Sequence, residues 1–173
     1  MGFVVPYANI SYLIMIQKFT VHPVGFIRNK QEECKLEILT KYIPSLEALE
    51  GFSHIHVLWW AHLFDNENDR SNLTAHPPYK TAPGEMGIFA TRSPIRPNPI
   101  ALTVVKVLGI DYQHGIINIP YIDAENASPI LDVKPYHPTA DRVREVNVPD
   151  WCDHWPKWHE DSADFDWKSE LYL

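Results

Sequence analysis

Residues 87–107 read GIFATRSPIRPNPIALTVVKV and combine three patterns in succession. The first four residues are typical of the end of a strand, and the residues from Pro99 onward are typical of a long β-branched strand. Between these strands the chain places Arg92 and Arg96 among three prolines. Because proline fixes φ and has no N–H, the segment is stiff and poor in backbone donors. It is therefore either a structural corner or a preformed clamp for an anionic ligand.

The polar side chains of this loop suit both interpretations. Arg92 and Arg96 each present a planar guanidinium that matches a carboxylate or a phosphate. Asn98 adds two donors and one acceptor, which suit a base edge or an amino-acid head group. A rigid loop loses little entropy when a ligand binds, which favours a clamp. In a corner, the same arginines would instead pair with carboxylates of the protein body.

Outward from this loop, strand patterns dominate the chain. Residues 52–63 (FSHIHVLWWAHL) alternate with period two, so Ile55, Val57 and Trp59 are expected on one face. Further strands are predicted at 19–28, 34–43, 99–110, 116–124 and 129–137. Because strands do not alternate with long helices, we predict a mainly β fold, a small β-barrel with short helices and an irregular Trp-rich C-terminal tail.

Length, proline content and charge predict how the domain is organised. A chain of 173 residues with 15 prolines suits one domain with many rigid turns, including a long surface loop at 65–84. We expect an N-terminal extension (1–16), a barrel domain (17–145) and an acidic tail (146–173) that packs on the barrel or on a partner subunit. Residues 150–170 carry seven acids against two lysines, a balance of −5 within the net −7. This balance argues against a general nucleic-acid binder but leaves room for a local basic face.

Cysteines and apolar segments predict the compartment. The two cysteines lie far apart and form no CxxC pair, so a disulfide framework is not expected. The apolar start of the chain is interrupted by Pro6 and Asn9, and no other stretch is long enough to span a bilayer. We therefore expect a cytoplasmic protein that does not enter a membrane.

Two polar clusters are candidates for chemistry. His54 and His56 lie on one strand face and would make half of a metal site, but no acid follows them nearby, so no metal is expected. Around the segment 121–136, Asp123 can accept from a ribose hydroxyl or a substrate amine, whereas Asp132 can hold Lys134 or an arginine of the loop. The same segment also has good turn chemistry. Tryptophans of the tail either stack on nucleobases or, as we favour, dock the tail.

Four segments together resemble the TsaA-like (TrmO) family. They are VHPVGFIR (21–28), GFSHIHVLWWAH (51–62), GIFATRSPIRPNPIALT (87–103) and PILDVKPYHP (129–138), which match the family's blocks in order and spacing. The resemblance covers about residues 19–141. It implies a small β-barrel that binds S-adenosylmethionine, a homodimer with its site near the subunit interface, and methylation of the exocyclic amine of a threonylcarbamoyl-modified adenosine in the tRNA anticodon loop.

The resemblance also implies roles for individual residues, and it makes the arginine–proline loop a clamp. Cofactor contacts are expected from His62, Leu63, Arg92, Ser93, Asn98, Val104, Glu125, Asn126, Ala127 and Ser128. Substrate contacts are expected from Arg96, Lys134 and Tyr136. Asp123 and Asp132 are the candidate carboxylates that take the proton from the adenine amine.

Differences from the family pattern leave the methyl acceptor open. The Pro-Arg-Gln stretch of tRNA-modifying members is replaced by residues 29–38 (NKQEECKLEI), the GTPV turn is ASPI, and the glycine of the loop is Ala101. The C-terminal extension of bacterial members is replaced by the acidic tail. The alternatives are an S-adenosylmethionine-binding barrel that acts on another acceptor and a binding module without catalysis. A tRNA would need a local basic patch, for which the candidates are Arg28, Lys30, Lys80, Arg142 and Arg144.

Overall fold

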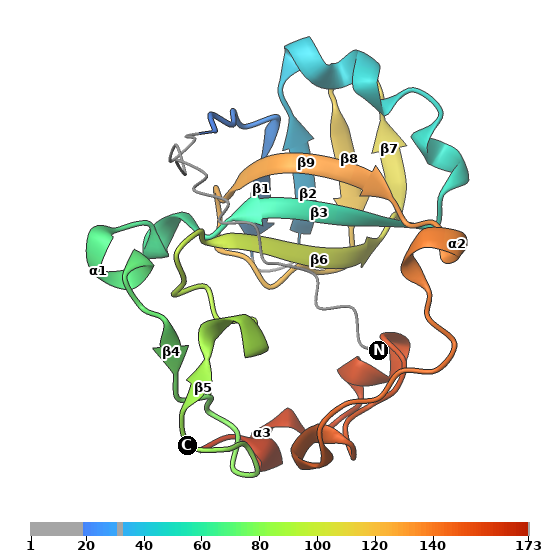
Figure 1. Ribbon diagram of the computed structural model, residues 1–173. Helices are drawn as coiled ribbons and strands as arrows, with labels where there is room; N and C mark the ends of the chain where they lie inside the picture. The colour runs from blue at the N-terminus through green and yellow to red at the C-terminus, as the bar shows by residue number, and fades with distance from the viewer. Residues whose placement is uncertain (1–18, 31–32, 173) are drawn as a thin grey trace, which may run out of the picture.

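The computed structural model describes residues 19–30 and 33–172, which form nine strands and several short helices (Figure 1). The predicted extension, residues 1–16, lies outside this range. The strands are β1 (Gly25–Lys30), β2 (Glu33–Ile38), β3 (His54–Trp60), β4 (Thr74–Ala75), β5 (Met86–Gly87), β6 (Ile100–Lys106), β7 (Gly109–Asp111), β8 (Ile116–Ile119) and β9 (Pro129–Pro135). The helices α1 (Glu67–Arg70), α2 (Pro138–Asp141) and α3 (Trp167–Glu170) have four residues each.

Seven strands form one antiparallel sheet in the order β6-β3-β9-β1-β2-β8-β7. The prediction of a mainly β protein with short helices is confirmed. Among the strands described, however, β6 and β7 are edges that do not pair with each other, so the expected barrel is not closed. These two edges are separated by Val107 and Leu108 alone. Because so short a link joins the opposite edges of the sheet, the sheet curls until its edges meet at one corner.

The concave face of this sheet carries the hydrophobic core. Ile55, Val57 and Trp59 of β3 are buried and alternate with half-buried residues, as the period-two pattern predicts. Ile27 from β1 and Ile130 from β9 are completely buried beside them. Because these side chains leave water together, the sheet is stabilised mainly by apolar burial.

Some predicted elements have different bounds from those expected. The strand expected at 34–43 ends at Ile38, and Thr40–Leu46 forms a 3-10 helix that includes Pro44. The Tyr42 N–H donates to the Leu39 carbonyl at 2.8 Å, so the chain turns into this helix directly after the strand. The loop expected at 65–84 contains α1 and β4, and β4 pairs with β5 in a small second sheet.

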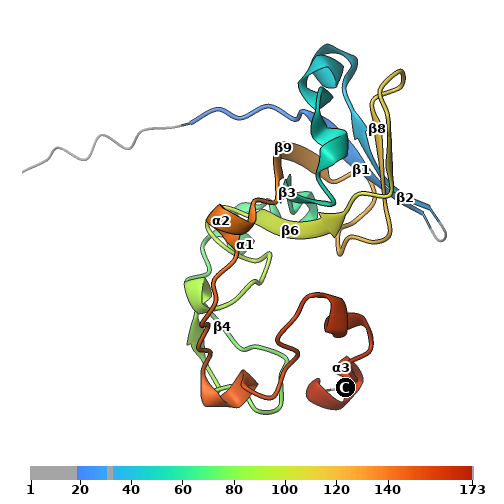
Figure 2. The same cartoon turned by 90° about the vertical axis from the view of Figure 1, so that its right-hand side faces the viewer.

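The C-terminal tail packs against the segment 78–80, beside β4 and β5 and below the large sheet (Figure 1). The Tyr79 ring lies 4.6 Å from that of Trp155, measured between centroids, and the Lys80 N–H donates to the Glu170 carbonyl at 2.8 Å. Figure 2 shows the tail, in red, turning back from this lobe toward β6. The division of the chain at residues 145 and 146 stays a prediction. No helix among the described residues is long and apolar enough to cross a membrane.

Candidate functional site

A cavity of about 1130 Å³ lies between the end of β3, strand β6, the arginine–proline loop and the turn that precedes β9. Its wall on the sheet side is formed by Trp59 and by residues 100–104 of β6. The Trp59 indole N–H donates to the Thr103 hydroxyl at 3.0 Å, and the pairing of β3 with β6 places Trp59 opposite Ala101. The sheet therefore supplies a flat, fixed wall.

The second wall joins the end of β3 to the turn before β9. The Ser128 hydroxyl lies 3.2 Å from Nδ1 of His62, and Ser128 is completely buried. Ala127 has a left-handed backbone with φ of 68°. Its N–H donates to the Ile27 carbonyl at 2.8 Å, so the turn is tied to β1 despite the strain that this conformation costs a residue with a Cβ.

Asn29 holds the rest of this turn in place. Its side-chain N–H donates to the carbonyl of Ala124 at 3.0 Å, and its backbone N–H donates to the Asn126 side chain at 3.2 Å. Sequence reasoning missed Asn29, because these contacts join residues 95 and 97 positions apart and have no local signal.

The third wall is the arginine–proline loop. The Thr91 hydroxyl accepts from the Ser93 N–H, and the Ser93 hydroxyl accepts from the Ile95 N–H, each at 3.2 Å. These side chains satisfy backbone groups in a loop whose prolines have no N–H to offer. An Arg92 N–H donates to the Leu102 carbonyl of β6 at 3.4 Å. The loop is thus anchored to the sheet through a residue that also faces the cavity.

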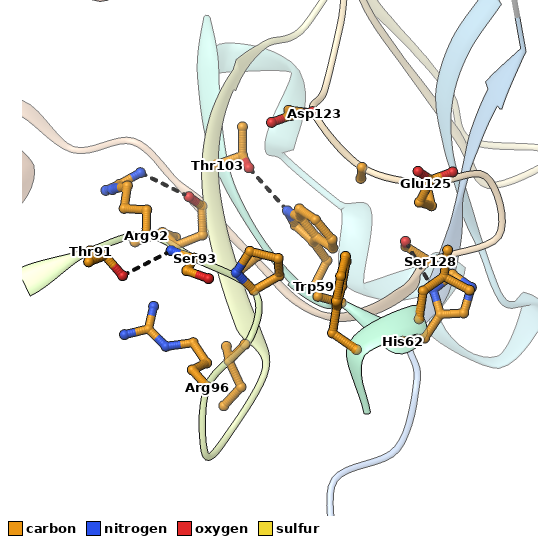
Figure 3. Close-up of a pocket in the computed structure, with 18 of the residues that line it drawn as sticks. Trp59, His62, Thr91, Arg92, Ser93, Arg96, Thr103, Asp123, Glu125 and Ser128 are labelled. Carbon is orange, nitrogen blue, oxygen red and sulfur yellow. Dashed lines mark hydrogen bonds between the residues drawn. The ribbon is translucent and has the colours of Figure 1, made fainter. Parts of the chain in front are cut away.

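Charges are divided across the cavity (Figure 3). Arg92 and Arg96 lie on one side of Trp59, and Glu125, Ser128 and His62 lie on the other. In the part of the chain that the structure describes, neither arginine forms an ion pair. The structural-corner interpretation requires such pairs, so the loop matches a clamp better.

Asp123 provides a carboxylate at the edge of the cavity. The Tyr121 hydroxyl lies 3.5 Å from it. Burial, together with the nearby charge of Asp123, raises the pKa of Tyr121. The phenol therefore stays protonated and can donate to the carboxylate.

Most of the predicted site residues come together here. The cavity lining includes His62, Leu63, Arg92, Ser93, Arg96, Val104, Asp123, Glu125, Asn126 and Ser128. The lining also includes Trp59, Phe89, Thr103 and His159, which the sequence did not predict as site residues. Phe89 is 85% exposed. The sequence gives no sign of this, because a phenylalanine in an apolar segment is normally expected in the core.

Five predicted residues lie outside the lining. An Arg70 N–H donates to the side-chain Oδ1 of Asn98 at 3.4 Å, and Asp132 pairs with Lys134 at 2.7 Å. The Tyr136 ring lies 5.5 Å from that of His56, and Ala127 contributes its backbone to the turn. A shift in the register of β9 against β3 accompanies this difference, because Asp132 lies opposite Leu58 whereas the buried Ile130 lies opposite Trp59.

Among the described residues, those considered for a metal site and for a basic RNA-binding patch do not gather at one place as the cavity residues do. Across residues 19–30 and 33–172, no three potential metal ligands come together. Of the five cations proposed for a basic patch, three have partners within the chain. Arg28 pairs with Glu37, Lys80 donates to the Ser169 carbonyl, and Arg142 lies 5.2 Å from the Trp158 ring.

Comparisons with known proteins agree with the motif blocks. A family model described as the tRNA-methyltransferase O N-terminal domain matches residues 17–142. An S-adenosyl-L-methionine-binding protein of Archaeoglobus fulgidus is 36% identical over 112 residues, which cover 65% of this chain and 75% of that protein. The tRNA (adenine(37)-N6)-methyltransferase of Escherichia coli is 29% identical over 135 residues, which cover 76% of this chain and 57% of that protein.

The fold agrees with a solved structure as well. The crystal structure of TrmO from Pseudomonas aeruginosa matches with a TM-score of 0.59 and 28% identity. The match covers 76% of this chain and 62% of the TrmO chain, so the chain spans about three fifths of that protein.

Proposed function

The chain belongs to the tRNA-methyltransferase O N-terminal domain family, and from this premise we propose that it transfers a methyl group from S-adenosylmethionine to N6 of a threonylcarbamoyl-modified adenosine in the tRNA anticodon loop. One observation supports the proposal above all others. Two arginines without ion pairs in the described chain face two carboxylates across one cavity.

The residues of the cavity fit S-adenosylmethionine by charge and size. Arg92 and Ser93 suit the carboxylate of its amino-acid part, and Glu125 suits an ammonium or a ribose hydroxyl. Pockets for drug-sized ligands measure roughly 300–1,000 Å³. A volume of about 1130 Å³ therefore leaves room for part of a second ligand, such as an adenine base.

The chemistry needs alignment and removal of one proton. When bound, the cofactor supplies an electrophilic methyl carbon on a sulfonium sulfur. The anchored walls hold both reactants in line, which can supply much of the rate. Asp123, at the edge of the cavity, takes the proton that the adenine amine loses as the new bond forms. Arg96 meets a phosphate of the RNA.

The same proposal includes a cytoplasmic homodimer. Phe89, Ile100 and Leu102 are exposed apolar side chains beside the cavity, as expected if a second subunit covers them. Sedimentation of the purified protein tests this assembly, and a monomer at micromolar concentration would contradict it.

The activity is tested with labelled S-adenosylmethionine and tRNA that either carries or lacks the threonylcarbamoyl group. We expect transfer to the modified tRNA alone, and transfer to neither would contradict the proposal. Arg92→Ala is the variant to compare, because it removes the proposed cofactor contact together with the hydrogen bond to the Leu102 carbonyl.

A second candidate is a cofactor-binding module that acts without tRNA. The partners of Arg28, Lys80 and Arg142 favour it, because these cations are already engaged within the chain. Binding measured at increasing salt concentration distinguishes the two candidate functions. Binding of tRNA weakens steeply as salt rises, whereas cofactor binding changes little.

A further inference from the structure

We propose that the C-terminal tail forms the acceptor side of the cavity and that His159 hydrogen-bonds the base that receives the methyl group. This inference rests on the proposed function, but it concerns a residue and a segment to which that function assigns no role.

His159 reaches the cavity from a distant part of the chain. It lines the cavity together with residues 29–128, and it directly precedes the 3-10 helix Glu160–Ala163. Its side chain is exposed, and among the described residues its imidazole has no hydrogen bond or ion pair. The other imidazole of the lining, His62, is already engaged by Ser128. His159 is therefore the lining imidazole that is available to a ligand.

The position of His159 relative to the family segment points to the acceptor. The family model ends at residue 142, and every other lining residue lies within it. The cavity walls inside the family segment suit the cofactor, which is the ligand that family members share. His159 lies outside that segment, so it suits the methyl acceptor, which is the ligand that can differ between members. The volume of the cavity leaves space for such a second ligand.

The tail is held firmly enough to place a side chain. Glu170 accepts hydrogen bonds from Nε2 of His154 at 2.9 Å and from the Trp155 indole at 3.1 Å. The Trp155 ring also packs 5.4 Å from that of Trp167. Aromatic pairs at this separation add to the stability of a cluster beyond their apolar burial. His159 lies four residues after Trp155, between this cluster and the 3-10 helix Glu160–Ala163.

The charges around His159 suit a nucleobase better than a bare phosphate, because Glu160 and Asp161 directly follow it and would repel a phosphate. Elsewhere in the tail, Asp153 pairs with Lys157 at 2.6 Å and Asp166 accepts from the Ser169 N–H. Trp158, beside His159, is 58% exposed and has the Arg142 guanidinium 5.2 Å from its ring. A planar ring and an imidazole whose nitrogens have no partner among the described residues provide stacking and hydrogen bonding, which are the interactions that recognise bases.

The test compares His159→Ala and His159→Gln with His114→Ala. His114 is an exposed histidine of the β7–β8 turn that pairs with Asp111 and does not line the cavity. For both His159 variants we expect an unchanged dissociation constant for S-adenosylmethionine and a loss of about three- to tenfold in kcat/KM for modified tRNA, the value of one hydrogen bond. His114→Ala should match the wild type, and tail tryptophan fluorescence should be the same in all variants.

Two results would overturn the inference. One is an unchanged kcat/KM in both His159 variants, and the other is weaker cofactor binding with normal transfer at saturating cofactor, which would make His159 a cofactor contact.

Failure of the proposed function is recognised separately. If the wild type methylates no tRNA, that function fails, and the imidazole resonances of His159, assigned with His159→Gln, are followed while N6-threonylcarbamoyladenosine is added to the cofactor-bound protein. A shift of these resonances supports the inference, and its absence overturns it.

Discussion

The Nδ1 atom of His62 lies 3.2 Å from the hydroxyl of Ser128, and this contact joins two blocks of sequence that are 66 residues apart. His62 follows β3 and Ser128 precedes β9, so the contact fixes two walls of one cavity to each other. Ser128 is completely buried, so His62 is the partner that satisfies its hydroxyl.

Replacing Ser128 with alanine tests this contact. The change removes the hydrogen bond to the half-buried His62 ring, and such a bond contributes about 0.5–1.5 kcal/mol. We expect the free energy of unfolding in denaturant to fall by about this amount and affinity for S-adenosylmethionine to fall with it. Ser71→Ala, at the exposed end of α1, is the control. Equal stability and affinity in both variants would show that the contact has no energetic role.

The two arginines of the loop are expected to act on different ligands. Arg92→Ala should weaken S-adenosylmethionine binding by roughly 10- to 100-fold, because a hydrogen bond to a charged group contributes about 1.5–3 kcal/mol. Arg96→Ala should leave cofactor binding unchanged and reduce the salt dependence of tRNA binding by about one unit of slope. Calorimetry and filter binding measure the two effects. The assignment is wrong if both variants lose cofactor affinity equally.

Asp123 and Asp132 were equal candidates for the base, and their surroundings now separate them. Asp123 lines the cavity, whereas Asp132 is held by Lys134 at 2.7 Å outside it. Asp123→Asn should reduce single-turnover methyl transfer by about 100-fold or more at saturating cofactor. Asp132→Asn should leave the rate unchanged. Full transfer by Asp123→Asn would exclude it as the base.

Glu170 makes the stability of the tail depend on pH. Hydrogen bonds from His154 and then from Trp155 lower its pKa below the usual 4.5. Its carboxylate therefore stabilises the tail fully above pH 4.5, and this contribution is lost as pH falls through the lower pKa of the folded protein. We expect Glu170→Gln to destabilise the tail at pH 7 and the difference from the wild type to shrink below pH 4.5. Fluorescence-monitored unfolding measures this, and a constant difference would contradict it.

Gly115 is expected to tolerate no side chain. Its φ is 68°, and an added Cβ would lie 2.8 Å from a side-chain carbon of Ile43 and 2.9 Å from the Ile38 carbonyl oxygen. Gly115→Ala should therefore lower the free energy of unfolding by at least about 1–3 kcal/mol. Gly84→Ala, where a Cβ would meet nothing within 4 Å, should have little effect. Chemical denaturation compares the two, and similar values would contradict the prediction.

The sequence by itself determined the local features of this protein. Alternation in β3 and the proline-stiffened loop with its arginines were predictable, because strand period and backbone stiffness depend on neighbouring residues. The residue blocks also predicted the family, and most of the site residues that they predicted line the cavity.

The tertiary structure alone decided which of these features meet. It tied Asn29 to the turn at 124–126, brought His159 to the cavity, placed Asp132 outside it and left the edge strands β6 and β7 without pairing to each other. Each of these outcomes depends on how the sheet curls and on where the tail packs. They are set by contacts between residues far apart in the chain, which no local pattern of the sequence encodes.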